Sequence, residues 1–237
     1  EEAVHEAVLH GGIEAACTPT LNPRANTVVG IWAAPLLRRS AGDTLAAGTF
    51  MDAADRSRLS NSVWTLAIEH ATHTVARFGD DALLWVRVPA TFIRDIDPDR
   101  YINPNVLSPA RYRLAVTGLL DRQLDEISVA RITALRGRGV MIYAIVDLDC
   151  GSPFALLSSL PVDGMVIEGA WVHASPGSST AAPVLNGLIE AAAATGWQTA
   201  VTGVTTPEQL AWLSARSVAT VSGPYVDATW PVSLHQN

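Results

Sequence analysis

Lysine is absent from the chain, and all sixteen basic residues are arginine. A reaction that passes through a Schiff base on a lysine side chain is therefore excluded. Cysteine is scarce as well: Cys17 and Cys150 lie far apart and form no CxxC pair, so a zinc site is not indicated. Two isolated thiols are typical of the reducing cytosol, and we expect a cytoplasmic protein.

Charged residues and long apolar runs are also few. Only 16% of the 237 residues are charged, and the net charge of -7 argues against binding to a nucleic-acid polymer. The longest apolar run, from Val140 to Val146, is far shorter than the ~20 residues of a membrane span. A hydrophobic content of 49% nevertheless supports a substantial core and is too high for a disordered chain.

The chain begins at Glu1 with neither Met nor a signal-like apolar stretch. We therefore expect residues 1–237 to form a single domain that has been excised from a longer protein. The stretch from Pro98 to Pro109 is rich in Pro and Asn, but it is too short for an interdomain linker and is interpreted as a connection within the domain.

Short β-prone runs alternate with helix-period segments along most of the chain. The alternation predicts a mainly parallel sheet with helices outside it. We predict eight strands, at Ile13–Cys17, Thr27–Ala33, Ala82–Val88, Tyr112–Thr117, Val140–Val146, Gly164–Ile167, Gln198–Val201 and Val218–Ser222. The predicted helices are Asn61–Phe78 with Ser60 or Asn61 as cap, Leu119–Arg136, Ser179–Thr195, and one that begins at Pro207 with Thr206 as N-cap.

Eight strands in a chain of this length are typical of a (β/α)8 barrel. The segment from Thr18 to Asn26 leaves no room for a helix between the first two strands, which should pair antiparallel as a hairpin. The fold class predicted is therefore α/β, a TIM-like barrel with an antiparallel first strand.

Several segments carry a family resemblance in the same order and at similar spacing. "VVGIWAAPLLR" is similar to IVGxEALLRW, "WVRVPATFI" to xVNLSxxQL, "YRLAVTG" to LELEITE, and "VTGVTTPEQLAWL" to AEGVETxxQLxxL. The motif "LPVD", Leu160 to Asp163, and the Gln209–Leu210 segment are the most specific. Over nearly its whole length the chain resembles the EAL domain, the cyclic-di-GMP phosphodiesterase barrel. The resemblance implies hydrolysis of a phosphodiester by two divalent cations held at strand ends.

The chain departs from this family at the positions that hold the cations. Hard cations require carboxylate or amide oxygens, and the resemblance places few of them here. The equivalent positions carry Trp32 for the Glu of EAL, Arg87 for the Asn of NLS, Ala115 and Gly118 for the two Glu of LEITE, Val146 and then Asp147 for the Asp pair, Val166 and Glu168 for the Lys and Asp of LKID, and Thr202 and Thr205 for the Glu residues of EGVET.

These departures predict a degenerate EAL domain that is not an enzyme and needs no cofactor or metal. A single carboxylate, Asp147, does not hold two Mg²⁺ or Mn²⁺ ions, and Arg87 would repel them. The first hypothesis is therefore a regulatory or interaction module in bacterial cyclic-di-GMP signalling. The phosphate-binding Arg of the family falls on Leu36, although Arg38 and Arg39 follow it.

Two alternatives remain open. Arg87 at the strand ends could attract an anion, so the domain could bind cyclic-di-GMP without cleaving it. The acids Asp147, Asp149 and Glu168 could instead support phosphodiesterase or other phosphoester chemistry. The candidate ligand-binding residues are Trp32, Arg87, Asp147, Asp149, Glu168 and Thr202. We also expect a protein partner or an attached signalling domain, and the family's mode of pairing implies that a homodimer could form.

Two further groups have a simple structural interpretation. His70 and His73 are three residues apart on a predicted helix and could share a face, but a helix surface is favoured over a metal pair because no further ligand converges there. Asp147 and Asp149 could form a carboxylate pair at a strand end, or equally could cap a loop by accepting from backbone N–H groups.

Overall fold

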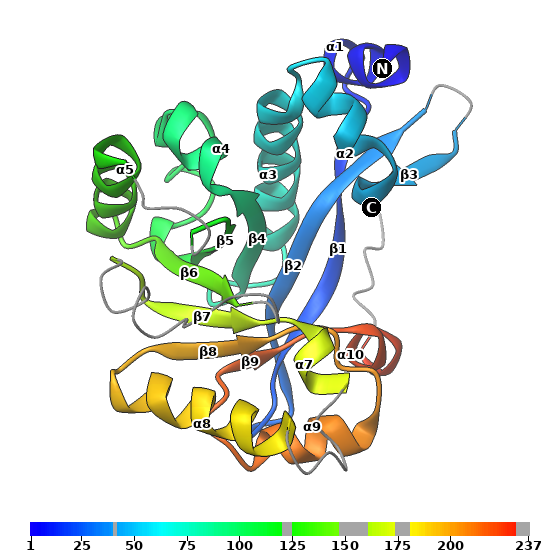
Figure 1. Ribbon diagram of the computed structural model, residues 1–237. Coiled ribbons are helices and arrows are strands. Elements are labelled where there is room, and N and C mark those ends of the chain that lie inside the picture. Colours follow the sequence, from blue (N-terminus) through cyan, green and yellow to red (C-terminus); the bar gives the residue numbers. More distant parts are fainter. Residues whose placement is uncertain (40–41, 120–124, 147–160, 174–180, 231–237) are drawn as a thin grey trace.

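The computed structural model describes residues 1–39, 42–119, 125–146, 161–173 and 181–230. Eight strands form a closed barrel in the order β1-β9-β8-β7-β6-β5-β4-β2, because β1 also pairs with β2 (Figure 1). This confirms the predicted fold class. The strands are β1 Ile13–Asn22, β2 Thr27–Arg38, β4 Leu83–Pro89, β5 Tyr112–Thr117, β6 Met141–Val146, β7 Gly164–Ile167, β8 Gln198–Val201 and β9 Thr220–Val221, and a ninth strand, β3 Thr44–Ala46, extends the sheet beyond β2.

The antiparallel hairpin of β1 and β2 is longer than predicted. Its register runs without interruption from Ile13 opposite Leu37 to Thr20 opposite Gly30, and the one shift follows Thr20. Pro35 is tolerated because it lies beyond Ala33, the last residue of β2 that pairs with β4, so no ladder hydrogen bond is lost on that side. The hairpin therefore projects past the barrel, and β3 pairs with its end.

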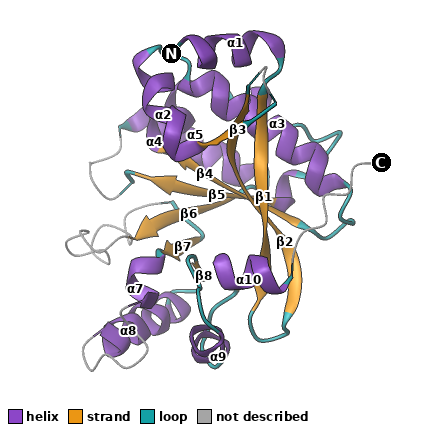
Figure 2. Ribbon diagram, turned by 90° about the vertical axis from the view of Figure 1, so that its right-hand side faces the viewer, coloured by secondary structure: helices purple, strands orange, loops and turns teal. Residues whose placement is uncertain are grey.

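Helices surround the barrel (Figure 2). They are α1 Glu2–His10, α2 Ala47–Arg56, α3 Ser60–Ala76, α4 Ala90–Asp95, α5 Glu126–Gly137, α7 Gly169–His173, α8 Ala181–Ala194, α9 Pro207–Ser214 and α10 Pro224–Thr229, with 3-10 turns at Pro98–Arg100 and Pro109–Arg111. Among the residues described, no helix combines the length and the apolar character that crossing a membrane would require.

Local signals at the helix ends account for several boundaries. Thr206 caps α9 in a capping box with Gln209, as predicted. The cap predicted for α3 was wrong by one residue or two, because Leu59 is the N-cap and Ser60 already belongs to the helix. The start predicted for α5 was also wrong: the helix begins at Glu126, where the Asp125 carboxylate accepts a hydrogen bond from the Ser128 N–H (2.8 Å).

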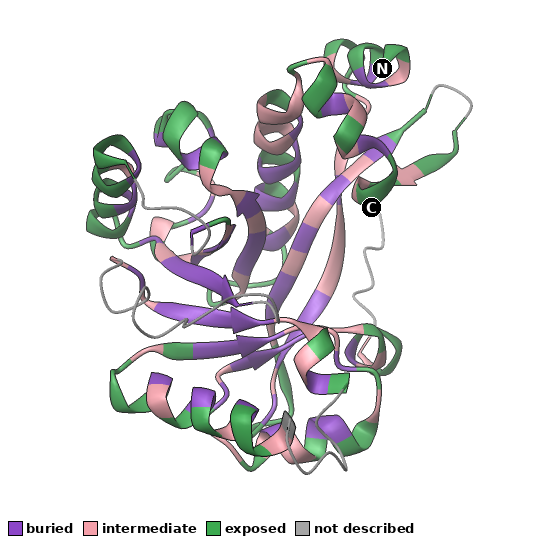
Figure 3. Ribbon diagram, in the orientation of Figure 1, coloured by how far each residue is buried: buried purple, intermediate pink, exposed green. Residues whose placement is uncertain are grey.

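The strands bury both faces, as expected for a parallel barrel (Figure 3). Alternate side chains divide into two clusters. The outer cluster, which the helices cover, includes Leu84, Val86, Leu114, Val116, Ile142 and Val146. The inner cluster fills the barrel and consists of Trp85, Ala115, Tyr143, Ile145, Val166 and Ala200, with Trp32, Leu83 and Met141 packed against it.

Candidate functional site

The C-terminal ends of the parallel strands form one end of the barrel, called the mouth here. Arg87 lies there because it follows Trp85 by two residues on β4 and so points inward. Glu168 follows Val166 by two residues, directly after β7, and Thr202 follows Ala200 directly after β8. Two further candidate residues, Asp147 and Asp149, lie outside the residues that the structure describes.

Arg87 and Glu168 form an ion pair across the mouth. The contact joins Arg87 Nη2 to Glu168 Oε1, and the side chains are 40% and 28% exposed. Because β5 and β6 separate β4 from β7 in the sheet, the pair links strands that are not neighbours. The Glu168 Oε1 atom is itself buried and accepts no hydrogen bond from the described part of the chain, so the ion pair with Arg87 is its compensating contact.

Aromatic rings fill the barrel beneath this ion pair. Trp32 and Trp85 are register partners on β2 and β4, and their rings stack with centroids 5.6 Å apart and planes 8° apart. Tyr143 packs against Trp85 with a centroid distance of 4.6 Å. The Tyr143 hydroxyl donates to Gln198 Oε1 (2.8 Å), and burial raises the pKa of this tyrosine to about 12. The stacked rings of Trp32 and Trp85 form an apolar layer beneath the ion pair.

Ala115 and Thr202, which the resemblance also aligns with metal ligands, carry no carboxylate. Ala115 is buried in the inner cluster, and Thr202 uses its N–H to donate to the Ile167 carbonyl (3.0 Å). Val146, which the resemblance aligns with the first Asp of the family's pair, packs in the outer cluster and adds no oxygen ligand to the mouth. Across the described ranges, no group of three or more His, Cys, Asp or Glu side chains could hold a metal ion.

Close packing of the backbone accounts for the glycine that follows Thr202. Gly203 adopts a positive φ of 74°, and a β-carbon there would lie 2.6 Å from the Gly169 Cα. The loops after β7 and β8 therefore touch backbone to backbone at the mouth. This backbone contact requires glycine at position 203 whatever the neighbouring side chains are. Gly203 is therefore explained by the packing of the fold and not by a role in binding or catalysis.

Neither arginine that follows Leu36 takes over its position. The register of β2 is unshifted around Pro35, so Arg38 stays two residues beyond Leu36. Arg38 forms a bidentate pair with Glu14, with donor–acceptor distances of 2.7 and 2.8 Å, and Arg39 pairs with Asp43. The sequence-based alternative in which a strand shift brings one of them into place is therefore not supported.

The sequence profile of the EAL domain family matches residues 1–228. The chain belongs to the EAL domain family. No curated protein sequence matches it significantly.

Solved EAL structures share this fold at low sequence identity. The c-di-GMP complex of the PaMucR phosphodiesterase is 16% identical with a TM-score of 0.80, over 94% of this chain and 93% of that one. An EAL domain protein from Listeria monocytogenes EGD-e is 14% identical with a TM-score of 0.80, over 97% and 96%. The FimX EAL domain of Xanthomonas citri in complex with c-diGMP is 16% identical with a TM-score of 0.80, over 94% and 90%.

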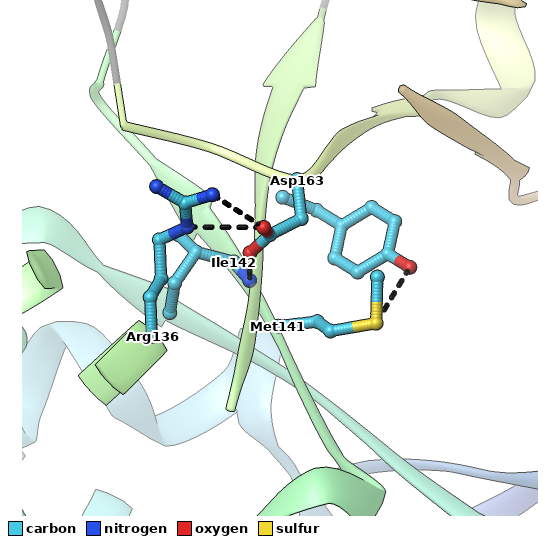
Figure 4. Close-up of polar contacts among 5 residues, drawn as sticks. Arg136, Met141, Ile142 and Asp163 are labelled. Carbon is cyan, nitrogen blue, oxygen red and sulfur yellow. Dashed lines mark hydrogen bonds and ion pairs between the residues drawn. The ribbon is translucent and has the colours of Figure 1, made fainter. Parts of the chain in front are cut away.

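In this EAL domain, the Asp of the LPVD motif, Asp163, contacts Arg136 and Ile142 (Figure 4). These contacts lie at the starts of the strands, the end of the barrel opposite the mouth. Asp163 Oδ1 accepts from Arg136 Nε and Nη2 at 3.0 and 2.8 Å, and Oδ2 accepts from the Ile142 N–H at 2.9 Å. The Asp163 carbonyl also accepts from the Gln198 N–H (3.1 Å). One residue thus ties α5 and the starts of β6, β7 and β8 together, far from the mouth.

His70 also has a structural role in this EAL domain. Its Nδ1 accepts a hydrogen bond from the Ala15 N–H at 3.2 Å. Ala15 lies opposite Pro35 and beyond Leu21, the residue at which β1 pairs with β9, so its N–H has no strand partner on that side. The favoured interpretation of His70 as part of a helix surface is therefore refined: α3 supplies the acceptor that the sheet lacks.

Sequence reasoning missed the link between Arg87 and Glu168, although it named both residues. Both side chains were placed at strand ends, and their opposite charges were the available signal. The two strands are not sequence neighbours, and only closure of the barrel brings their ends to face each other.

Proposed function

We propose that this chain is a non-catalytic EAL domain that serves as a regulatory or interaction module in cyclic-di-GMP signalling. The ion pair between Arg87 and Glu168 carries the proposal. In two-metal hydrolysis, two cations stabilise the attacking and leaving oxygens. Several oxygen ligands from the protein are needed to hold those cations. A guanidinium at the mouth is a permanent positive charge that repels such cations and engages a carboxylate that could have bound one.

The side chains around the ion pair support the same proposal. Trp32 places an indole ring, stacked on Trp85, at the position of the family's Glu. Ala115 and Thr202 provide a methyl group and a neutral hydroxyl where the family has carboxylates. A neutral hydroxyl is a weaker ligand than a carboxylate for a hard cation, and a methyl group is no ligand at all.

A hydrolysis assay tests this proposal. The chain is incubated with cyclic-di-GMP and either Mg²⁺ or Mn²⁺, and the products are separated by chromatography. An EAL phosphodiesterase assayed in parallel shows that the substrate and the metal are active. We expect no turnover above the rate without protein, whereas turnover at the rate of the control enzyme would refute the proposal.

A receptor that binds cyclic-di-GMP without cleaving it is the second candidate. Arg87 supplies a cation at the mouth, and several similar structures contain this dinucleotide. Titration calorimetry and a thermal-shift measurement distinguish the two candidates. Heat of binding together with a raised unfolding temperature would favour a receptor, and the absence of both would leave the interaction module.

Hydrolysis of a phosphodiester or another phosphoester by the remaining acidic residues has less support. It would rely on Asp147, Asp149 and Glu168, but Glu168 is already engaged by Arg87. A screen of phosphoesters and glycosides, carried out with the chain and with an Asp147→Asn variant, would reveal it as activity that the substitution removes.

A further inference from the structure

We infer that Glu168 is a specificity-determining residue that excludes phosphodiester anions from the mouth by holding Arg87. The inference rests on the proposed non-catalytic function, because it concerns binding at a mouth without metal ions. An anion that enters the mouth would bind the Arg87 guanidinium, and the Glu168 carboxylate competes with that anion for the same group.

The geometry supports competition for the same guanidinium. Arg87 Nη2 contacts Glu168 Oε1, so one edge of the fork that would bind a phosphate is already engaged. Because Arg87 is still 40% exposed, a ligand could reach it from solvent. An incoming phosphodiester must therefore displace the Glu168 carboxylate or share the guanidinium with it.

Either outcome disfavours an anion in the native chain. If the phosphodiester displaces Glu168, the buried Oε1 atom loses its ion-pair partner without a new hydrogen bond. If the two share Arg87, like charges lie within a few ångströms of each other in a partly buried site. The neighbouring mouth residues Ala115 and Thr202 offer no second positive charge to offset this repulsion.

The surroundings of the pair make Glu168 more than a surface charge. The ion pair connects β4 to β7 above the rings of Trp32 and Trp85. The Glu168 carboxylate therefore lies at the mouth. By contrast, the ion pair between Arg138 and Asp99 lies at the opposite end of β6, where it does not face the mouth. Arg138 is 40% exposed, as Arg87 is, while Asp99 is 72% exposed, so this second pair is a control for the loss of a carboxylate away from the mouth.

The test is a set of calorimetric titrations with cyclic-di-GMP in buffer that contains EDTA, so that metals do not contribute. The proteins are the native chain, Glu168→Gln, the double variant Glu168→Gln with Arg87→Gln, and the control Asp99→Asn. Thermal unfolding of each variant verifies that it is folded. Glu168→Ser provides a second removal of the carboxylate if the glutamine variant does not fold.

We expect Glu168→Gln to bind cyclic-di-GMP at least about tenfold more tightly than the native chain, which corresponds to about 1.4 kcal/mol. The gain should disappear in the double variant and should be absent in Asp99→Asn. Equal affinities of the native chain and of either Glu168 variant would overturn the inference, as would a gain that survives the loss of Arg87. Chromatography of the same samples shows whether the dinucleotide is cleaved, so a failure of the non-catalytic assignment is detected separately.

Discussion

Replacing Asp163 with alanine should destabilise the barrel at its end remote from the mouth. The change removes a charged acceptor for the Ile142 N–H (2.9 Å) and the ion pair with Arg136 (2.8 Å). A hydrogen bond to a charged group contributes about 1.5–3 kcal/mol. The ion pair adds at most about 1 kcal/mol because the Arg136 side chain is 38% exposed. The expected loss in the free energy of unfolding is therefore about 2–4 kcal/mol.

Urea denaturation followed by circular dichroism measures this loss, and a thermal scan should show a midpoint lower by about 5–15 °C. Asp163→Asn is the matched control, because its amide oxygen can still accept from the Ile142 N–H while the ion pair is lost. We expect Asp163→Asn to cost about 1 kcal/mol or less. If Asp163→Ala were no more destabilising than Asp163→Asn, the hydrogen bond to β6 would not be what anchors this end of the barrel.

Three further changes test packing and ionisation. Gly30→Ala should destabilise the fold by about 1–3 kcal/mol or more in urea denaturation, because a β-carbon there would lie 2.1 Å from a backbone oxygen of β4. The control is Gly48→Ala in α2, whose β-carbon would have no atom within 4 Å; it should be neutral or stabilise the fold by up to about 1 kcal/mol. Burial raises the pKa of the Cys17 thiol from 9.0 to about 12, so its thiolate fraction at pH 8 is about a thousandfold lower in the folded chain. The greater nucleophilicity of a thiolate with a raised pKa offsets part of this difference. In a Cys150→Ser background, an aromatic disulfide reagent at pH 8 should therefore react at least about tenfold more slowly with the folded chain than with the urea-unfolded chain. Burial raises the pKa of Tyr143 from 10.0 to about 12, so its hydroxyl loses its proton at a lower pH in the unfolded chain than in the folded chain. The free energy of unfolding should therefore fall as the pH rises from about 10 to about 12, and it should fall more steeply than in the Tyr143→Phe variant.

The barrel itself could be predicted from the sequence because its strands are short apolar runs with helices between them. The absence of room for a helix between Thr18 and Asn26 predicted the hairpin, and β1 and β2 pair as expected. Their extension past Pro35 was not predicted, since proline usually ends a strand and only its place beyond β4 makes it harmless. Helix α1 was missed because it buries only Val4 and Ala7, a narrow apolar face.

The site could be predicted only in part, because motif alignment locates a residue but does not establish its orientation. Successive side chains of a strand point to opposite faces, so Val146 faces outward because Ile145 faces into the barrel. The structure places Arg87 at the mouth and Trp32 beneath it inside the barrel, and the stacking of Trp32 on Trp85 and the pairing of Arg87 with Glu168 depend on barrel closure. The LPVD motif was recognised from sequence, whereas the anchoring role of Asp163 became evident only from its contacts.

The most direct test of the central claim is the manganese content of the mouth. Anomalous scattering from crystals soaked in Mn²⁺ locates the ions independently of activity, and an active EAL phosphodiesterase soaked in the same way is the control. The account predicts no pair of ions beside Trp32 and the Arg87–Glu168 ion pair. Two manganese ions a few ångströms apart at that place would contradict it, because the mouth would then hold the metal centre that these side chains are argued to exclude.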